Sequence, residues 1–150
     1  MSAGLLLFRE VEGELQVLLV HPGGPLWAKR DEGAWSIPKG EFEAGEEPLA
    51  AAKREVEEEI GFVPNEELIR LEPVRQPSGK IVYAWAVRAE FNPAGIRSNT
   101  FEMEWPPKSG RMQQFPEVDH AAWFTIDAAG EKILKGQFPL LQQLQRKIRV

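Results

Sequence analysis

Short apolar runs separated by a polar turn predict that the chain begins with two paired strands. Residues 3–8 and 15–20 are mostly apolar, and the Glu-Gly-Glu sequence between them is typical of a turn. Residues 21–25 contain two prolines and two glycines. We expect this segment to leave the sheet, because proline has no amide donor for a strand ladder.

The clearest predicted helix covers residues 47–60. Pro48 suits the first helical position, Gly61 suits the residue that ends a helix, and Pro64 prevents an immediate continuation. Four apolar side chains recur at helical spacing and are expected to face the core: Leu49, Ala52, Val56 and Ile60.

The second half of the chain predicts further strands and a terminal helix. Residues 68–74 and 80–90 have strand character, residues 100–105 form a weaker strand, and residues 121–126 form another short one. A terminal helix is indicated by four apolar residues near one face: Leu140, Leu141, Leu144 and Ile148. Strands interleaved with a central and a terminal helix predict a mixed-sheet sandwich of the α/β or the α+β class.

Length and composition narrow the class of protein. A chain of 150 residues with 43% hydrophobic and 27% charged residues predicts one globular domain over residues 1–150. The absence of cysteine excludes disulfides, a thiolate nucleophile and a cysteine zinc site. The apolar run at residues 5–8 is too short for a membrane span or a signal peptide, so we expect a cytoplasmic protein with no membrane contact.

Negative charge is concentrated in one stretch. Residues 39–62 contain eight acidic and three basic residues, which accounts for the whole net charge of −5. Overall acidity argues against binding to duplex nucleic acid, which needs surplus Lys and Arg, whereas a dense acidic patch attracts cations.

Three of these acids share one side of the predicted helix. Glu55, Glu58 and Glu59 are three and four residues apart, and carboxylates at that spacing repel one another. A hard divalent cation such as Mg²⁺ or Mn²⁺, which prefers oxygen ligands, would neutralise them. The alternative interpretation is a solvated Glu-rich helix face.

The residues around these acids match a known pattern. The spacing runs Gly40, five residues, Glu46, seven residues, and then REVEEEIGF at residues 54–62. This resembles the Nudix box, in which every fixed position is matched. The resemblance implies a loop-helix-loop box on an α/β/α sandwich with a mixed sheet. It also implies a hydrolase that cleaves a diphosphate linkage in a nucleoside diphosphate joined to another moiety.

The same resemblance implies a role for each matched residue. Glu55, Glu58 and Glu59, with the backbone carbonyl of Gly40, would hold one or more Mg²⁺ or Mn²⁺ ions. The remaining matched positions would be structural or orienting: Arg54 beside Glu55, Glu46 between loop and helix, and Gly61 at the end of the box. For Arg54 and Glu46 a local ion pair is the alternative.

The proton acceptor has two candidates. Glu55 is the first, because a carboxylate beside a metal can reach the attacking water. Glu117 resembles a late acidic position that in some relatives serves as base or extra ligand, and an exposed loop acid is the alternative interpretation. His21 precedes a Pro-Gly-Gly loop and has no Asp or nucleophile near it in the sequence, so it is not expected to act as a base. His120 is only slightly better placed, through its proximity to Glu117.

The substrate is the least constrained part of the prediction. Residues 35–40 resemble the segment before the box in dinucleoside polyphosphate and inositol pyrophosphate hydrolases, so Lys39 is a candidate phosphate contact or a surface lysine. Tyr83 and Trp85 share one strand face, where either could stack a base, although core packing is the favoured interpretation.

Several functions therefore stay open at this level. We favour a nucleotide or dinucleoside polyphosphate as the small diphosphate substrate. Alternatives within hydrolases are ADP-ribose or another nucleotide sugar, capped RNA, and an inositol pyrophosphate. A non-catalytic nucleotide-sensing module is a different class, disfavoured because all three box carboxylates are present. A homodimer is compatible with the resemblance, but no residue requires it.

Overall fold

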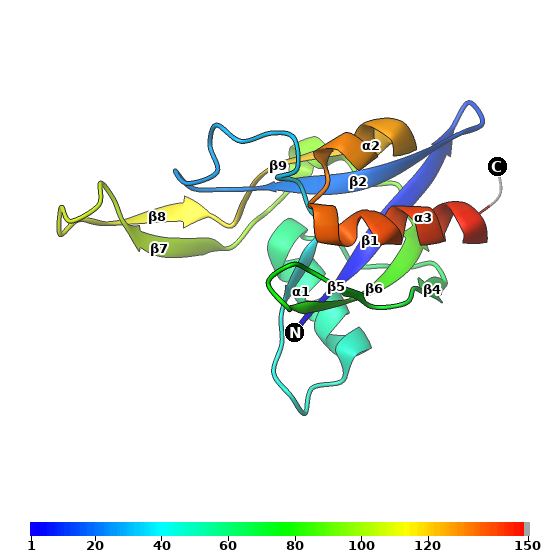
Figure 1. Ribbon diagram of the computed structural model, residues 1–150, viewed down its shortest axis with the longest axis horizontal. Coiled ribbons are helices and arrows are strands. Elements are labelled where there is room, and N and C mark those ends of the chain that lie inside the picture. Colours follow the sequence, from blue (N-terminus) through cyan, green and yellow to red (C-terminus); the bar gives the residue numbers. More distant parts are fainter. Residues whose placement is uncertain (149–150) are drawn as a thin grey trace.

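The computed structural model describes residues 1–148 and shows a mixed sheet with helices on its faces (Figure 1). Within this range seven strands form the sheet, in the order β4-β6-β1-β2-β9, with β3 beside β1 and β5 beside β6. β1 and β6 run parallel and the other neighbours antiparallel. The bounds are β1 Ser2–Val11, β2 Glu14–Pro22, β3 Lys39–Glu41, β4 Leu68–Arg70, β5 Val74–Arg75, β6 Ile81–Arg88 and β9 Val118–Thr125. The predicted α/β class with a mixed sheet is confirmed.

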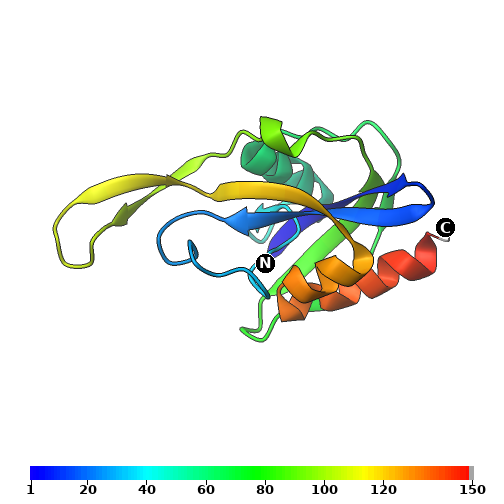
Figure 2. The same cartoon turned by 90° about the horizontal axis from the view of Figure 1, so that it is seen from above.

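The helices lie in two layers with the sheet between them, as Figure 2 shows from above: α1 (Pro48–Ile60) lies on one face, and α2 (Ile126–Lys132) and α3 (Phe138–Lys147) on the other. The central strand β1 contributes side chains to the cores on both faces of the sheet. Leu5 and Leu7 belong to the core under α1, whereas Leu6 and Phe8 belong to the core under α3. Burial on both faces explains why this strand is continuously apolar rather than alternating.

Helix α1 begins and ends as its capping residues predict. The Glu47 carboxylate accepts a hydrogen bond of 2.8 Å from the Ala50 N–H, and Gly61, with φ of 77°, donates to the Glu57 carbonyl at 2.8 Å. The buried stripe differs slightly from the prediction: Ala51 is fully buried and Leu49 only partly. A helix face packed on a sheet is wider than a single row of side chains.

The terminal helix is confirmed, and a shorter helix before it was not predicted. Leu140, Leu141 and Leu144 of α3 are buried against the sheet. Residues 121–125 are the end of the longer strand β9, and Ile126, which was predicted to belong to the strand, is the first residue of α2, capped by Thr125. None of the helices within residues 1–148 is long and apolar enough to cross a membrane.

Two other segments differ from the predicted strands. Residues 68–74 form β4 and β5 rather than one strand, with Pro73 in the interruption, where it has no amide donor for the ladder. A short 3-10 turn at Pro93–Gly95 and another at Lys135–Gln137 join the later elements.

The weak strand at residues 100–105 is one half of a projecting ribbon. β7 (Thr100–Glu104) pairs with β8 (Met112–Pro116), which the sequence did not predict, and the pair extends away from the body of the molecule in both views (Figures 1 and 2). We call β7, β8 and their connecting turn the ribbon. The ribbon leads directly into β9, which begins beside the acidic residues of α1.

Candidate active site

The predicted acidic residues come from α1, and Gly40 is brought to them by β3. β3 pairs with the start of β1, where Gly40 lies opposite Ala3, and α1 packs over the same strand. A Cβ atom added to Gly40 would lie 2.0 Å from Oε2 of Glu55. Only glycine allows the backbone and this carboxylate to approach so closely.

Arg54 connects the loop before α1 to Glu55. Its guanidinium donates two hydrogen bonds to the Glu46 carboxylate, at 3.0 and 2.8 Å, and one to Glu55 Oε1 at 2.9 Å. A fork of this kind fixes both orientation and position. The contacts fit the orienting role implied for Arg54 and the bracing role implied for Glu46, and they equally describe a local ion pair, so both roles stay predictions.

Glu117 lies near the α1 acids although it is the residue between β8 and β9. Burial raises the pKa of Glu117, and the negative charge of Glu58 raises it further. Burial also raises the pKa of Glu55, against the opposing effect of Arg54. We call Glu55, Glu58, Glu59 and Glu117 the acidic site. Their mutual repulsion is the electrostatic feature that a cation would relieve.

Glu59 has the most perturbed carboxyl group of this set. Burial raises its pKa to about 8, and the charges of Glu117 and Glu55 act in the same direction. Its Oε1 accepts a hydrogen bond of 3.3 Å from the backbone N–H of Lys39, and the Lys39 charge partly opposes the shift. Strongly shifted groups in a cleft are typical of functional sites.

Lys39 lies in the same depression. A pocket of about 220 Å³ is lined by Lys39, Glu59 and Glu117, with Trp27 and Pro22 on another side. Burial lowers the pKa of Lys39, and the positive charge of Lys80 lowers it further. A cation placed in this way can bind an anionic group that enters the pocket.

The donor set suits a hard cation that keeps some of its own water. Carboxylates of the acidic site and the Gly40 carbonyl are oxygen donors of the kind that Mg²⁺ and Mn²⁺ take. Within residues 1–148 no three acidic or histidine side chains converge closely enough to surround an ion by themselves. An ion at this position would therefore need water or substrate oxygens as further ligands.

Tyr83 lies away from this pocket. Its ring contacts Phe42 edge to face, with centroids 5.9 Å apart, and both Tyr83 and Trp85 pack against the core under α1. These contacts support core packing over base stacking for the two residues.

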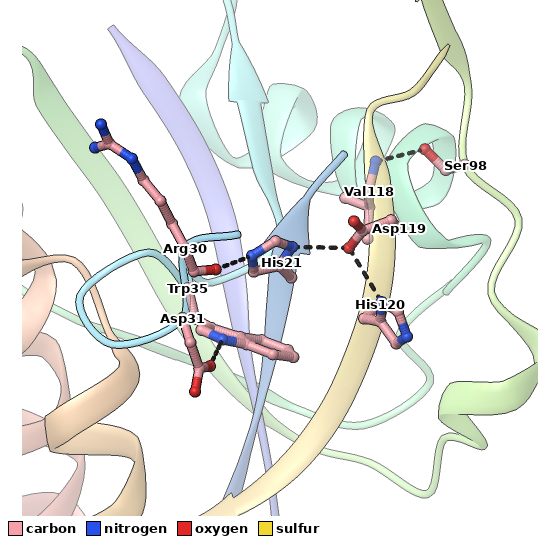
Figure 3. Close-up of polar contacts among 8 residues, drawn as sticks. All are labelled: His21, Arg30, Asp31, Trp35, Ser98, Val118, Asp119 and His120. Atoms are coloured by element: carbon pink, nitrogen blue, oxygen red, sulfur yellow. Dashed lines mark hydrogen bonds and ion pairs between the residues drawn. The ribbon is translucent and has the colours of Figure 1, made fainter. Parts of the chain in front are cut away.

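His21 was expected to lack an acidic partner, and that expectation is wrong. Its Nδ1 lies 2.8 Å from Asp119 Oδ1, its Nε2 lies 2.6 Å from the Arg30 carbonyl oxygen, and its ring contacts Trp35 edge to face (Figure 3). The partner comes from the pairing of β2 with β9, which places His21 opposite His120 at an irregular step. A contact across 98 residues leaves no local signal in the sequence.

These contacts attach the β2–β3 loop, residues 23–38, to β9. His21 is buried, whereas His120 is exposed and lies 3.2 Å from the same Asp119 oxygen (Figure 3). The loop carries Trp27, a pocket residue that the sequence analysis did not single out. The available signal was a large aromatic side chain within a Gly-Pro loop.

Comparison with curated proteins gives matches to short parts of the chain. An RNA pyrophosphohydrolase of Halorhodospira halophila is 51% identical over 43 residues, which are 28% of this chain and 24% of that protein. One of Rhodospirillum rubrum is 39% identical over 64 residues, which are 41% of this chain and 37% of that protein. The chain thus spans well under half the length of these relatives.

Solved structures agree in fold. A C. elegans Ap4A hydrolase in a binary complex has a TM-score of 0.67 and 21% identity, covering 98% of this chain and 97% of that one. The NUDIX domain of Shewanella oneidensis NrtR, complexed with ADP ribose, has a TM-score of 0.64 and 17% identity, covering 97% and 86%. At these identities the likeness concerns the fold alone. Because the NUDIX domain family model matches residues 1–144, the chain belongs to the Nudix family.

Proposed function

We propose that the protein is a metal-dependent pyrophosphohydrolase that cleaves the diphosphate linkage of a nucleotide-like substrate. One observation carries the proposal. Three carboxyl groups with raised pKa values, those of Glu55, Glu59 and Glu117, interact electrostatically with one another and with Glu58. Glu59 and Glu117 line one pocket with the half-buried Lys39, and the Glu55 carboxylate lies against Gly40. Family membership and the partial likeness to RNA pyrophosphohydrolases support it.

Metal binding is assigned to the acidic site. Glu55, Glu58 and Glu59, with the Gly40 carbonyl and Glu117, would hold one or more divalent ions, and Mg²⁺ or Mn²⁺ is the proposed identity. When bound, such an ion neutralises phosphate charge and lowers the pKa of water to the range in which it attacks phosphorus.

The chain's own residues position the reactants and accept the proton. Arg54 holds Glu55 through Oε1, which leaves Oε2 beside Gly40 as the oxygen that can accept a proton from the attacking water. Glu117, which lines the pocket, is the second candidate base. Lys39 would bind a phosphate oxygen and compensate its charge.

The favoured substrate is a nucleotide or dinucleoside polyphosphate. The Ap4A hydrolase has a similar fold over nearly the full chain, and the RNA pyrophosphohydrolases share short segments of higher identity. ADP-ribose or another nucleotide sugar, capped RNA and inositol pyrophosphate remain alternatives. Two other predictions come from the sequence: the protein does not bind duplex nucleic acid, and it is cytoplasmic. A homodimer is compatible with the family resemblance.

A nucleotide-sensing module is the candidate from another class. The NrtR domain, which is complexed with ADP ribose, has the same fold. The intact acidic site disfavours this alternative, because a module that only binds ligand needs no repelling carboxylates at one position.

The test is product release with and without Mg²⁺ from nucleoside triphosphates, diadenosine polyphosphates, ADP-ribose, capped dinucleotide and an inositol pyrophosphate. Chromatography of the products would identify the scissile bond. Glu58→Gln should reduce the rate at least about a hundredfold, roughly 2.7 kcal/mol of transition-state stabilisation. Glu57→Gln, an exposed neighbour on the same helix, is the matched control. Binding of a nucleotide with no turnover of any substrate would favour the sensing module.

A further inference from the structure

A second groove lies beside the acidic site, between the β2–β3 loop and the ribbon. Its volume is about 230 Å³, and its walls are Gly24, Leu26 and Trp27 from the loop and Phe101 and Met103 from β7. We call it the aromatic groove. It shares Pro22, Trp27 and Glu117 with the pocket that contains Lys39 and Glu59, so the two pockets adjoin, and we call them together the depression.

The two walls of the aromatic groove are fixed to one another. The Gly23 N–H donates a hydrogen bond of 3.0 Å to the Glu117 carbonyl, and a Cβ on Gly23 would lie 2.0 Å from the Pro116 carbonyl oxygen. Gly24 has φ of +93°, and a Cβ there would lie 2.9 Å from Cζ of Phe101. The loop therefore lies directly against the base of the ribbon, and glycine is required at both positions.

The depression is polar at one end and apolar at the other. Lys39 and Glu59 line the polar end, and Glu117 lies at the junction. At the apolar end the Leu26 side chain is 61% exposed, and Trp27 and Phe101 each keep part of their surface accessible. The Arg30 guanidinium lies 5.5 Å from the Trp27 ring, which adds a positive charge beside this wall.

The size and lining of the groove select a flat ring as occupant. Pockets for drug-sized ligands are about 300–1,000 Å³, so this one suits a single ring system rather than a whole dinucleotide. Aromatic side chains gain most from an aromatic partner, and stacking tolerates any base because every base has a π-face. The adjoining polar end suits phosphates attached to that ring through a sugar.

We propose that the aromatic groove binds the nucleobase of the substrate and that the ribbon is a specificity-determining element. In this arrangement Trp27 and Phe101 hold the base while its phosphates extend toward Lys39 and the acidic site. The inference rests on the proposed function, since it names the chemical group that makes the substrate a nucleotide rather than another diphosphate.

The test compares ligands that differ only in the base. Calorimetry or saturation-transfer NMR would measure binding of the four nucleoside monophosphates and of ribose 5-phosphate to the wild-type protein and its variants. Wild type should bind at least one nucleotide more tightly than ribose 5-phosphate. Trp27→Leu and Phe101→Leu should weaken nucleotide binding about tenfold to a hundredfold, as loss of base stacking does. Phe101→Leu, which changes only the aromatic groove, should leave ribose 5-phosphate binding unchanged.

Phe115→Leu is the matched control. Phe115 is the cross-strand partner of Phe101, with ring centroids 6.0 Å apart, so both variants lose the same aromatic pair, but Phe115 does not line the groove. It should bind nucleotides as wild type does. The inference is wrong if wild type shows no preference for the nucleotides, or if Phe101→Leu and Phe115→Leu behave alike. These readouts need no turnover, so they distinguish a failure here from a failure of the proposed hydrolase activity.

Discussion

The acidic site and the aromatic groove meet at Glu117, yet they are built in different ways. Three of the four acids lie within one turn and a half of α1, whose caps and helical repeat set their spacing locally. Trp27 and Phe101 are far apart in the chain. They meet because β2 pairs with β9 and because Gly23 and Gly24 let the loop lie against the ribbon.

The acidic site and the aromatic groove also differ in the kind of surface that they present to a ligand. The acidic site concentrates negative charge, whereas the aromatic groove leaves apolar side chains accessible. A single ligand with phosphates at one end and a flat ring at the other could occupy both regions. Its phosphates would bind together with a divalent ion at the acidic site, and its ring would pack in the aromatic groove. The difference teaches that, under the proposed function, one short segment sets the reaction chemistry and tertiary contacts set the choice of ligand.

The largest effect is expected from Gly40→Ala, which breaks the acidic site alone. The new Cβ would displace the flexible end of Glu55 rather than backbone, so activity should fall far more than stability. We expect kcat/KM to fall about a hundredfold, or about 2.7 kcal/mol, with the melting temperature lowered by less than about 4 °C. Gly95→Ala, at a position where nothing lies within 4 Å, is the control. Equal activity in the two variants would contradict the role given to the Gly40–Glu55 contact.

The next effect concerns the stability of the metal-free protein. Because burial raises the pKa of Glu59 from 4.5 to about 8, the folded state keeps a proton that the unfolded state releases within that window. Unfolding then becomes more favourable as pH rises. The loss of unfolding free energy from pH 5 to pH 8 should be on the order of 2 kcal/mol in urea titrations with EDTA, and smaller in Glu59→Gln. An identical pH slope in the variant would show that Glu59 is not the group responsible.

The third prediction concerns a substitution at His21 that should loosen the aromatic groove and leave the acidic site intact. His21→Phe keeps a ring beside Trp35 but removes both nitrogens that contact Asp119 and the Arg30 carbonyl. It should cost about 1.5 kcal/mol of unfolding free energy, because two part-buried hydrogen bonds are lost, and it should weaken nucleotide binding. His120→Phe, at an exposed position, should do neither. Equal stability of the two variants would mean that the loop needs no such anchor.

The smallest effect is expected at the junction of the two regions. Lys39→Met removes an amino group whose pKa is already lowered by burial. The variant should therefore fold at least as stably as wild type. Its KM for the hydrolysed substrate should rise about tenfold, near 1.4 kcal/mol, because a phosphate contact is lost. Lys53→Met on the exposed side of α1 is the control. An unchanged KM in Lys39→Met would show that Lys39 does not contact the substrate phosphate.

The sequence predicts the local features of the molecule better than those that depend on long-range contacts. The caps, the helical spacing and the box residues of α1 are all local, so the sequence predicted the helix, its acids and the sandwich on which it lies. The His21–Asp119 pair, β8 and the Trp27–Phe101 groove depend on long-range pairing and could not be predicted from neighbouring residues. α2 was missed because it is short and contains Gly130, a poor helix former.

The central claim is that the acids of α1 act together to hold a divalent ion. Electron paramagnetic resonance titration with Mn²⁺ tests it without any assumption about substrate, using wild type, Glu58→Gln and Glu57→Gln. Both variants remove one carboxylate charge from the exposed part of the same helix, so folding and net charge are matched. We predict that Glu58→Gln weakens Mn²⁺ binding at least about tenfold, while Glu57→Gln binds as wild type does. Equal affinities in the two variants, or no Mn²⁺ binding to wild type, would contradict the account.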